Sequence, residues 1–255
     1  VCIVPLTFGF LLPAGQLLAS VVRTAGHMLD ADFLRITGNS LMLAGSAAVV
    51  TLLVGLFMAY GKRLHGDRLV RGAVRVAGMG YAIPGTVIAI GVMIPFAWLD
   101  NSIDAWMRAR FDFSTGLLLS GTLVALLFAY MVRFLAVALQ TAEAGLGKIR
   151  PSMDEAARAL GLGPLEVLKK VHVPMLRGSL ITAMLLVFVD VLKELPATLV
   201  LRPFNFNTLA VRTYELAADE RLADAASASL AIVLAGIIPV ILLSQSLSRT
   251  RMRYE

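Results

Sequence analysis

The chain has 255 residues, of which 58% are hydrophobic and 16% are charged, and its mean hydropathy is +0.80. A water-soluble domain needs a more polar surface than this composition supplies, so the chain is predicted to lie in a membrane. Its net charge of +6 comes from short clusters between apolar runs, without interleaved aromatic residues, which excludes nucleic acid as a partner.

Six apolar stretches approach the length of about 20 residues that a helix needs to cross a bilayer. They predict an all-α, polytopic membrane protein whose six transmembrane helices lie at residues 1–22, 39–60, 74–99, 116–139, 179–201 and 225–247. The first stretch lacks the basic leading region and cleavage site of a signal peptide, so it is predicted to span the membrane. Because the chain starts inside this stretch without an initiator methionine, we expect it to be a half of a longer polypeptide.

The distribution of lysine and arginine between alternate loops predicts the orientation. The loops after the second and fourth stretches, together with the C-terminus, hold 14 of these residues, and the loops on the other side hold 7. Cytoplasmic loops have an excess of Lys and Arg, so both termini and the long polar loop 140–178 are predicted to be cytoplasmic.

The loop 140–178 is predicted to form two helices separated by a glycine turn. Pro151 or Ser152 can open the first helix, with Asp154 in its first turn, where a carboxylate suits the helix dipole. Gly161 and the Gly163-Pro164 pair end it, and Leu165 begins a second amphipathic segment. The alternative is an amphipathic helix that lies on the membrane surface without docking on a partner.

The spacing of small, apolar and acidic residues in this loop is specific. The order is Glu155, Ala156 and Ala157, three residues, Gly161, nine residues, Val171, one residue, and Val173-Pro174. This pattern resembles the EAA loop of the permease subunits of ABC importers. The resemblance implies that Glu155, Ala156, Ala157, Gly161, Val171 and Pro174 form the surface that docks on a dimer of ABC ATPase subunits, so we name residues 140–178 the coupling loop.

Two further segments are similar to the iron(III) group of these permeases, whose single polypeptide contains two six-helix halves. They are the segment from Tyr81 through Pro84 to Val87 and the segment from Lys193 through Pro196 to Thr198. The resemblance implies a bacterial inner-membrane permease domain, a second permease half, and ferric iron delivered by a periplasmic binding protein. Permeases for thiamine, polyamines, sulfate or phosphonates share the scaffold and remain alternatives.

Charged residues occur inside the fifth stretch, where each ionised group costs about 2.5 to 3.5 kcal/mol. Asp190 and Lys193 share a helix face and can neutralise one another, which leaves Glu194 over. Two readings stay open: an ion-pair cluster that fixes helix packing, or a pathway or gate. The residues predicted for this pathway or gate are Asp190, Lys193, Glu194, Pro196, Tyr81 and Pro84, and a helix break is expected at Pro196. Arg133 is expected to reach the lipid headgroups, or else to pair with the extra carboxylate.

No ATP site, cofactor or metal site is predicted within the chain. Gly145-Leu-Gly147-Lys148 has the wrong spacing for a phosphate-binding loop, so ATP is expected in the partner subunit. His27, His65 and His172 match no metal-ligand spacing. Two other classes remain as rivals: an intramembrane enzyme that uses Asp190 and Glu194 as acid and base, and a membrane scaffold without transport.

Overall fold

A computed structural model describes residues 3–28 and 30–251, with residues 25, 27, 28 and 242–251 as backbone only. Val1, Cys2 and residues 252–255 lie outside this part, so the predicted places of both chain ends are not described. Helices and short turns make up the described residues, which contain no strand. The elements are α1 (Ile3–Leu6), η1 (Thr7–Leu11), α2 (Leu12–Met28), α3 (Ala31–Leu64), α4 (Arg68–Ala77), η2 (Gly78–Ala82), α5 (Gly85–Phe111), α6 (Leu123–Leu146), α7 (Pro151–Ala159), α8 (Pro164–Val167), η3 (Leu168–His172), α9 (Val173–Leu192), α10 (Pro196–Leu201), α11 (Leu209–Ala218) and α12 (Leu222–Arg251).

Six helical segments of the described chain are long and apolar enough to cross a membrane, which confirms the expected number. Their bounds are Ile3–Thr24, Ala31–Leu64, Gly85–Phe111, Leu123–Leu146, Pro164–Leu192 and Leu222–Ile241. The helix that holds the second stretch, α3, extends beyond that stretch at both ends. It begins after Asp30, whose side chain accepts a hydrogen bond from the N–H of Phe33, and its last turn holds Lys62 and Arg63.

The predicted helix at 74–99 is wrong as a single element. The chain instead forms α4, a 3-10 turn at Gly78–Ala82, an extended Pro84 with φ −56° and ψ 139°, and then α5. A Cβ atom at residue 80 would overlap the carbonyl oxygen of Val132, so only glycine lets this turn lie against the backbone of α6. Pro84 then disfavours a helical conformation in the residue before it.

Substituting Gly80 by alanine is therefore expected to destabilise the fold by about 1–3 kcal/mol or more, because a backbone segment must move. Thermal unfolding of the purified protein in detergent measures this change. Gly78→Ala is the matched control: its new Cβ would lie 3.7 Å from Leu139 Cδ2, an ordinary contact. Equal melting temperatures for the two variants would contradict the close approach at Gly80.

The fourth predicted helix, at 116–139, begins and ends seven residues later, at Leu123–Leu146. Gly116 and Gly121 have φ of +62° and +72°, and Thr122 caps α6 by accepting a hydrogen bond from the N–H of Val124. The residues before it fold back along α5, where the buried Asp100 carboxylate accepts hydrogen bonds from the backbone of Leu118 to Ser120. Thr122 begins the helix because glycines with positive φ cannot continue one.

Helices α3, α6 and α9 form the centre of the molecule and pack closely through small residues. At Gly55 of α3 a Cβ atom would lie 3.0 Å from Ala138 Cβ of α6, so the two backbones approach closely. The buried core also holds Ala44, Ala47, Ala129 and Ala138. Small residues at helix contacts are typical of membrane proteins, where dispersion rather than water exclusion drives helix association.

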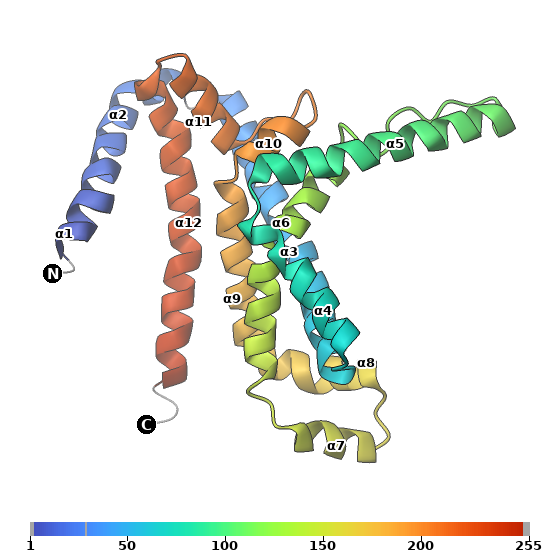
Figure 1. The fold of residues 1–255 in the computed structure, drawn as a ribbon. Coiled ribbons are helices and arrows are strands. Elements are labelled where there is room, and N and C mark those ends of the chain that lie inside the picture. Colours follow the sequence, from blue (N-terminus) through green and yellow to red (C-terminus); the bar gives the residue numbers. More distant parts are fainter. Residues whose placement is uncertain (1–2, 29, 252–255) are drawn as a thin grey trace.

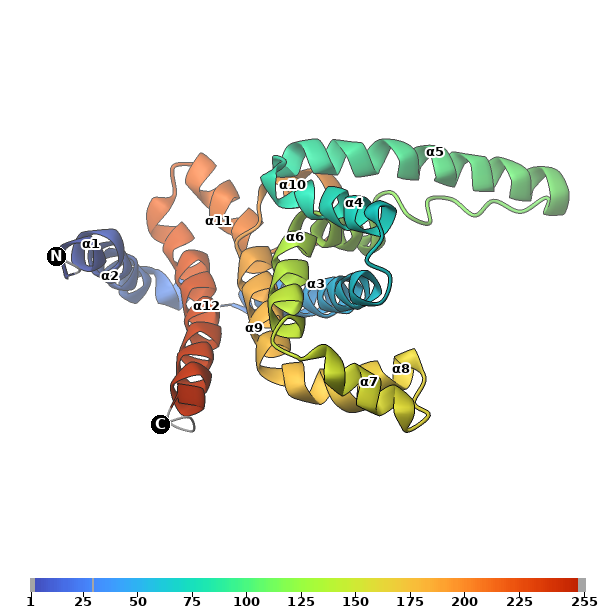
Figure 2. The same cartoon turned by 60° about the horizontal axis from the view of Figure 1, so that its bottom comes forward.

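The peripheral helices extend away from this centre. Figures 1 and 2 show α5 running nearly crosswise to α3, α6, α9 and α12, while α2 packs beside α12 on the opposite side. Large apolar side chains on η1 and α5 are exposed, among them Phe8, Ile94 and Trp98. Exposed apolar surface of this extent needs lipid or protein to cover it.

Candidate functional site

The coupling loop leaves the bundle at the end of α6 and returns at the start of α9. Figure 1 shows α7 as a short helix that lies apart from the bundle, beyond the ends of α3 and α6. Glu155 and Ala156 are exposed on α7, whereas Ala157 is buried. Of the two alanines expected on the docking surface, only Ala156 therefore faces outward in the isolated chain.

Gly161 ends α7 in a conformation that favours glycine. Its φ is +83°, the N–H of Gly161 donates to the carbonyl of Arg158, and the N–H of Leu162 donates to the carbonyl of Ala157. These two hydrogen bonds form a Schellman motif with Gly161 in the left-handed position. The motif glycine thus turns the chain at the end of α7, as the sequence predicted.

The last motif residues form the entry into the fifth spanning segment. Val171 is half-buried in the π-helical turn Leu168–His172, and the exposed Pro174 stands in the first turn of α9. The helix is continuous from Pro164 to Leu192, and a π-helical turn precedes this proline, which has no N–H to donate within the helix. The motif therefore extends from the exposed α7 to the start of a membrane helix.

Asp154, just before the motif, connects the coupling loop to the end of α3. Its carboxylate accepts hydrogen bonds from Arg63 Nε at 2.9 Å and from the buried His172 Nε2 at 2.7 Å. Arg63 also donates to the carbonyl oxygens of Leu146 and Ile149, at 2.5 and 2.9 Å. The sequence pattern could not predict this contact, because the two residues are 91 positions apart. From the sequence alone, Asp154 is an acid in the first turn of a helix and Arg63 is one of several cytoplasmic cations.

Tyr60 makes a second connection between α3 and the loop. Its hydroxyl donates to the carbonyl of Pro164 at 2.7 Å, and its ring meets the His172 ring edge-on, with centroids 5.3 Å apart. We call Tyr60, Arg63, Asp154 and His172 the α3 clamp. The position of His172 inside the motif predicts that it packs or hydrogen-bonds at the coupling surface, and the structure places it in this buried cluster.

The clamp has a pH-dependent component. Burial alone would raise the pKa of Asp154, but the hydrogen bonds from Arg63 and His172 outweigh it and hold this pKa below its ordinary value. A lowered native pKa gives stability that is complete above the unfolded pKa of about 3.9 and is lost as pH falls through the native value. Asp154→Asn is therefore expected to lower the melting temperature by a few degrees at pH 7 and by less near pH 3. An equal decrease at both pH values would contradict the ion pair.

A second polar cluster lies within the membrane-spanning part, where α9 stops at Leu192 and α10 starts at Pro196. Glu194 is buried in this break and caps α10: it accepts from the N–H groups of Ala197 and Thr198, at 3.1 and 3.2 Å, and from Thr198 Oγ1 at 2.9 Å. The break agrees with the one predicted at Pro196. The cap explains how a carboxylate remains at this depth.

Arg133 of α6 pairs with this carboxylate. Its Nη1 lies 3.8 Å from Glu194 Oε1, and Gly85 lies beside both, where a Cβ atom would be 2.7 Å from Glu194 Oε1. Tyr130 and Thr198 share a hydrogen bond of 2.5 Å at the same place. Of the two expectations for Arg133, the structure supports pairing with the extra carboxylate.

The other residues predicted for a gate lie around this pair rather than in it. Asp190 bridges to Lys193 at 2.9 Å, and the Lys193 side chain is 62% exposed. Pro84 precedes Gly85, and Tyr81 is exposed with its ring against Phe134. The structure thus joins Glu194 to Arg133, beside Gly85, and leaves Asp190 and Lys193 as a separate ion pair.

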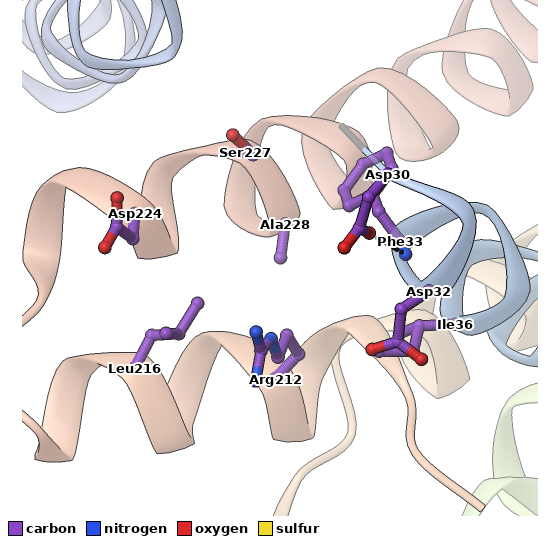
Figure 3. A pocket seen from close by; sticks show the side chains of 9 residues that line it. All are labelled: Asp30, Asp32, Phe33, Ile36, Arg212, Leu216, Asp224, Ser227 and Ala228. Atoms are coloured by element: carbon purple, nitrogen blue, oxygen red, sulfur yellow. Dashed lines mark hydrogen bonds between the residues drawn. The ribbon is translucent and has the colours of Figure 1, made fainter. Parts of the chain in front are cut away.

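At the end opposite to the coupling loop, α3, α11 and α12 enclose a cavity of about 40 Å³. In Figure 3, Arg212 points into the space between α11 and α12, with Asp224 on one side and Asp30 and Asp32 on the other. Within the described residues, no three His, Cys, Asp or Glu side chains gather as metal ligands.

Comparison with known proteins agrees with the family that the motif resembles. The family described as "Binding-protein-dependent transport system inner membrane component" matches residues 51–254. The Fe(3+)-transport system permease protein FbpB 2 of Haemophilus influenzae is 26% identical over 214 residues, which are 84% of this chain and 39% of that protein. The putative 2-aminoethylphosphonate permease protein PhnV of Salmonella paratyphi A is 27% identical over 214 residues, which are 84% of this chain and 73% of PhnV.

Solved structures share the fold at low identity. A bacterial alginate ABC transporter, solved with an alginate-bound periplasmic protein, superposes with a TM-score of 0.75 at 12% identity, covering 98% of this chain and 92% of that one. The MetNI methionine ABC transporter gives a TM-score of 0.57 at 15% identity, covering 83% and 94%. The all-helical architecture is therefore that of type I ABC importer permeases. With the family match over most of its length, this chain belongs to the binding-protein-dependent transport system inner membrane components, which are multi-pass membrane permeases.

Proposed function

We propose that this chain is half of the membrane pathway of an ATP-driven importer and that α7 docks on an ABC ATPase dimer. The observation that supports this most is the geometry of the motif: Glu155 and Ala156 are exposed on a helix apart from the bundle, and Gly161 turns the chain behind them. A short helix with an exposed carboxylate and a small neighbour can enter a groove of a partner. ATP would bind to the partner, and the chain itself would need no cofactor.

The orientation follows from this docking. With α7 on the cytoplasmic side, both chain ends would be cytoplasmic and the cavity beside Arg212 would face the periplasm, where a binding protein delivers substrate. The excess of Lys and Arg on the side of the coupling loop supports the same orientation.

A second permease half would complete the pathway. The chain spans about two fifths of the length of FbpB 2, which leaves room in that relative for another such domain. The exposed apolar surface of α5, with Ile94 and Trp98, extends away from the centre of this half. That surface would be covered by the second half and by lipid, whether the halves share a polypeptide or not.

The proposed substrate is ferric iron, supported by the permease proteins for Fe(3+) and ferric transport among the relatives. The second candidate is a phosphonate, because the PhnV proteins match at a similar identity. The enzyme alternative has less support: Glu194 is engaged by Arg133 and by the start of α10, while Asp190 pairs with Lys193. The two carboxylates are thus held by different partners instead of sharing one substrate.

Uptake into proteoliposomes tests the substrate. The complete importer, with its ATPase and binding protein, is given radiolabelled Fe(III) or radiolabelled 2-aminoethylphosphonate in separate experiments. ATP-dependent accumulation of iron alone is expected. Accumulation of the phosphonate alone would replace the iron proposal, and release of a chemical product by the permease without ATPase would favour the enzyme.

A further inference from the structure

Helix α3 is continuous where two other spanning segments are broken. It runs from Ala31 to Leu64, whereas α9 stops at Leu192 and the chain between α4 and α5 turns at Gly78–Pro84. Its 34 residues extend over about 50 Å, at about 1.5 Å per residue, which exceeds the thickness of a bilayer core. A continuous helix can transmit a displacement along its whole length, whereas a break can absorb one.

The α3 clamp fixes the end of this helix to the coupling loop. Arg63 contacts α7 through Asp154, the last residue of α6 through the carbonyl of Leu146, and the segment that follows α6 through the carbonyl of Ile149. The side chains of Arg63 and Asp154 are only 17% and 13% exposed. An ion pair that is shielded and supported by further hydrogen bonds holds its geometry better than an exposed pair.

The other end of α3 is fixed to α11. Ser40 Oγ accepts a hydrogen bond from the N–H of Leu209 at 2.8 Å, and Asn39 Nδ2 donates to the carbonyl of Asn207 at 3.3 Å. Ile36, Leu209 and Ala228 form a small buried cluster beside these contacts. The segment that borders the cavity of Figure 3 is therefore attached directly to α3.

We propose that α3 transmits movement of the coupling loop to the outer segment Asn207–Ala218, and that Arg63 and Tyr60 act as positioning residues for α7. The proposal rests on the proposed function, because docking of the ATPase supplies the movement. The route through α9 ends at the break between Leu192 and Pro196, so α9 moves the charged cluster inside the membrane while α3 reaches the outer face. The coupling loop would thereby move two parts of the pathway: the charged cluster inside the membrane and the segment at the outer face.

Distance measurements between spin labels test this route. Cysteines replace Leu160, 82% exposed beside the end of α7, and Leu34, 70% exposed at the outer end of α3, in a chain with Cys2→Ser. Double electron–electron resonance is recorded on the complete importer in nanodiscs, without nucleotide and after trapping with ATP and vanadate. The two states are expected to give the same mean distance, because α7 and α3 move together.

Arg63→Gln is expected to broaden this distance distribution, to shift its mean between the two states, and to raise the ATP consumed per imported substrate severalfold. Lys62→Gln is the matched control, since the adjacent Lys62 pairs with Glu143 on α6, at 2.8 Å, and is expected to behave as the unsubstituted protein. If Arg63→Gln does not assemble, Tyr60→Phe removes one hydrogen bond of the same clamp and should show the same changes in weaker form.

Two results would overturn the proposal: a distance from Leu160 to Leu34 that changes with nucleotide in the unsubstituted chain, or clamp variants that keep both the distance and the ATP cost. Failure of the ATPase to bind the unsubstituted permease is a different result. It would refute the proposed function, and the inference with it.

Discussion

Glu155→Lys is expected to reduce ATP-driven uptake more than about tenfold while the protein still inserts into the membrane. The exposed carboxylate is placed at the surface that we assign to the ATPase, and reversing a charge in an interface costs several kcal/mol, where about 1.4 kcal/mol already corresponds to a factor of ten. Glu155 accepts no hydrogen bond from its own chain among the described contacts, so the fold should not change. Uptake and ATP hydrolysis in proteoliposomes measure the effect.

A matched pair of neutral variants separates docking from general loop charge. Glu155→Gln should lower uptake severalfold, whereas Glu166→Gln should not. Glu166 is also exposed in the coupling loop and pairs with Lys170 at 2.9 Å. A glutamine there keeps an acceptor for the N–H of Gly163, which now donates to Glu166 at 3.2 Å. Unchanged uptake in Glu155→Lys, with normal amounts of protein in the membrane, would contradict ATPase docking at this position.

Glu194→Ala is expected to destabilise the protein by about 3 kcal/mol, the lower end of the cost of removing one partner of a buried ion pair, because the Arg133 side chain is 22% exposed. Arg133 would lose its counter-charge, and the N–H groups of Ala197 and Thr198 would lose their acceptor. Unfolding in mixed detergent micelles, titrated with sodium dodecyl sulfate, measures the loss.

The double variant Glu194→Gln with Arg133→Met is the control for the charge pair. It removes both charges and keeps an acceptor for α10, so it should recover most of the stability that Glu194→Ala loses. A double variant as unstable as Glu194→Ala would contradict both causes, because it keeps an acceptor for α10 and leaves no charge without a partner. Asp190→Asn should cost much less, because Lys193 is largely exposed and can be solvated.

The sequence could predict the elements that depend on local pattern. Apolar length predicts six spanning helices, and the spacing from Glu155 to Pro174 predicts the coupling loop and its turn at Gly161, because a Schellman motif needs only neighbouring residues. The break at Pro196 is predictable for the same reason. These features depend on residues that lie within one or two helical turns of each other.

Features that depend on contacts between residues far apart in the sequence could not be predicted. The turn at Gly80 exists because the backbone of Val132 lies against it, and hydropathy in 74–99 contains no sign of that neighbour. Arg63 resembles any other cytoplasmic cation until α7 brings Asp154 to it. The crosswise direction of α5 also has no sign in the sequence, since its composition satisfies the requirements of a spanning helix.

The central claim, that α7 meets the ATPase, is tested most directly by cross-linking. Ala156, which is exposed on α7, is replaced by cysteine in a chain with Cys2→Ser, and a short sulfhydryl-to-amine cross-linker is applied to inside-out vesicles that contain the whole importer. The prediction is a covalent product of permease and ATPase that forms with the Ala156→Cys variant and is absent with the Leu34→Cys variant. A product from the Leu34→Cys variant alone, or none from the Ala156→Cys variant in vesicles that hydrolyse ATP, would contradict the account.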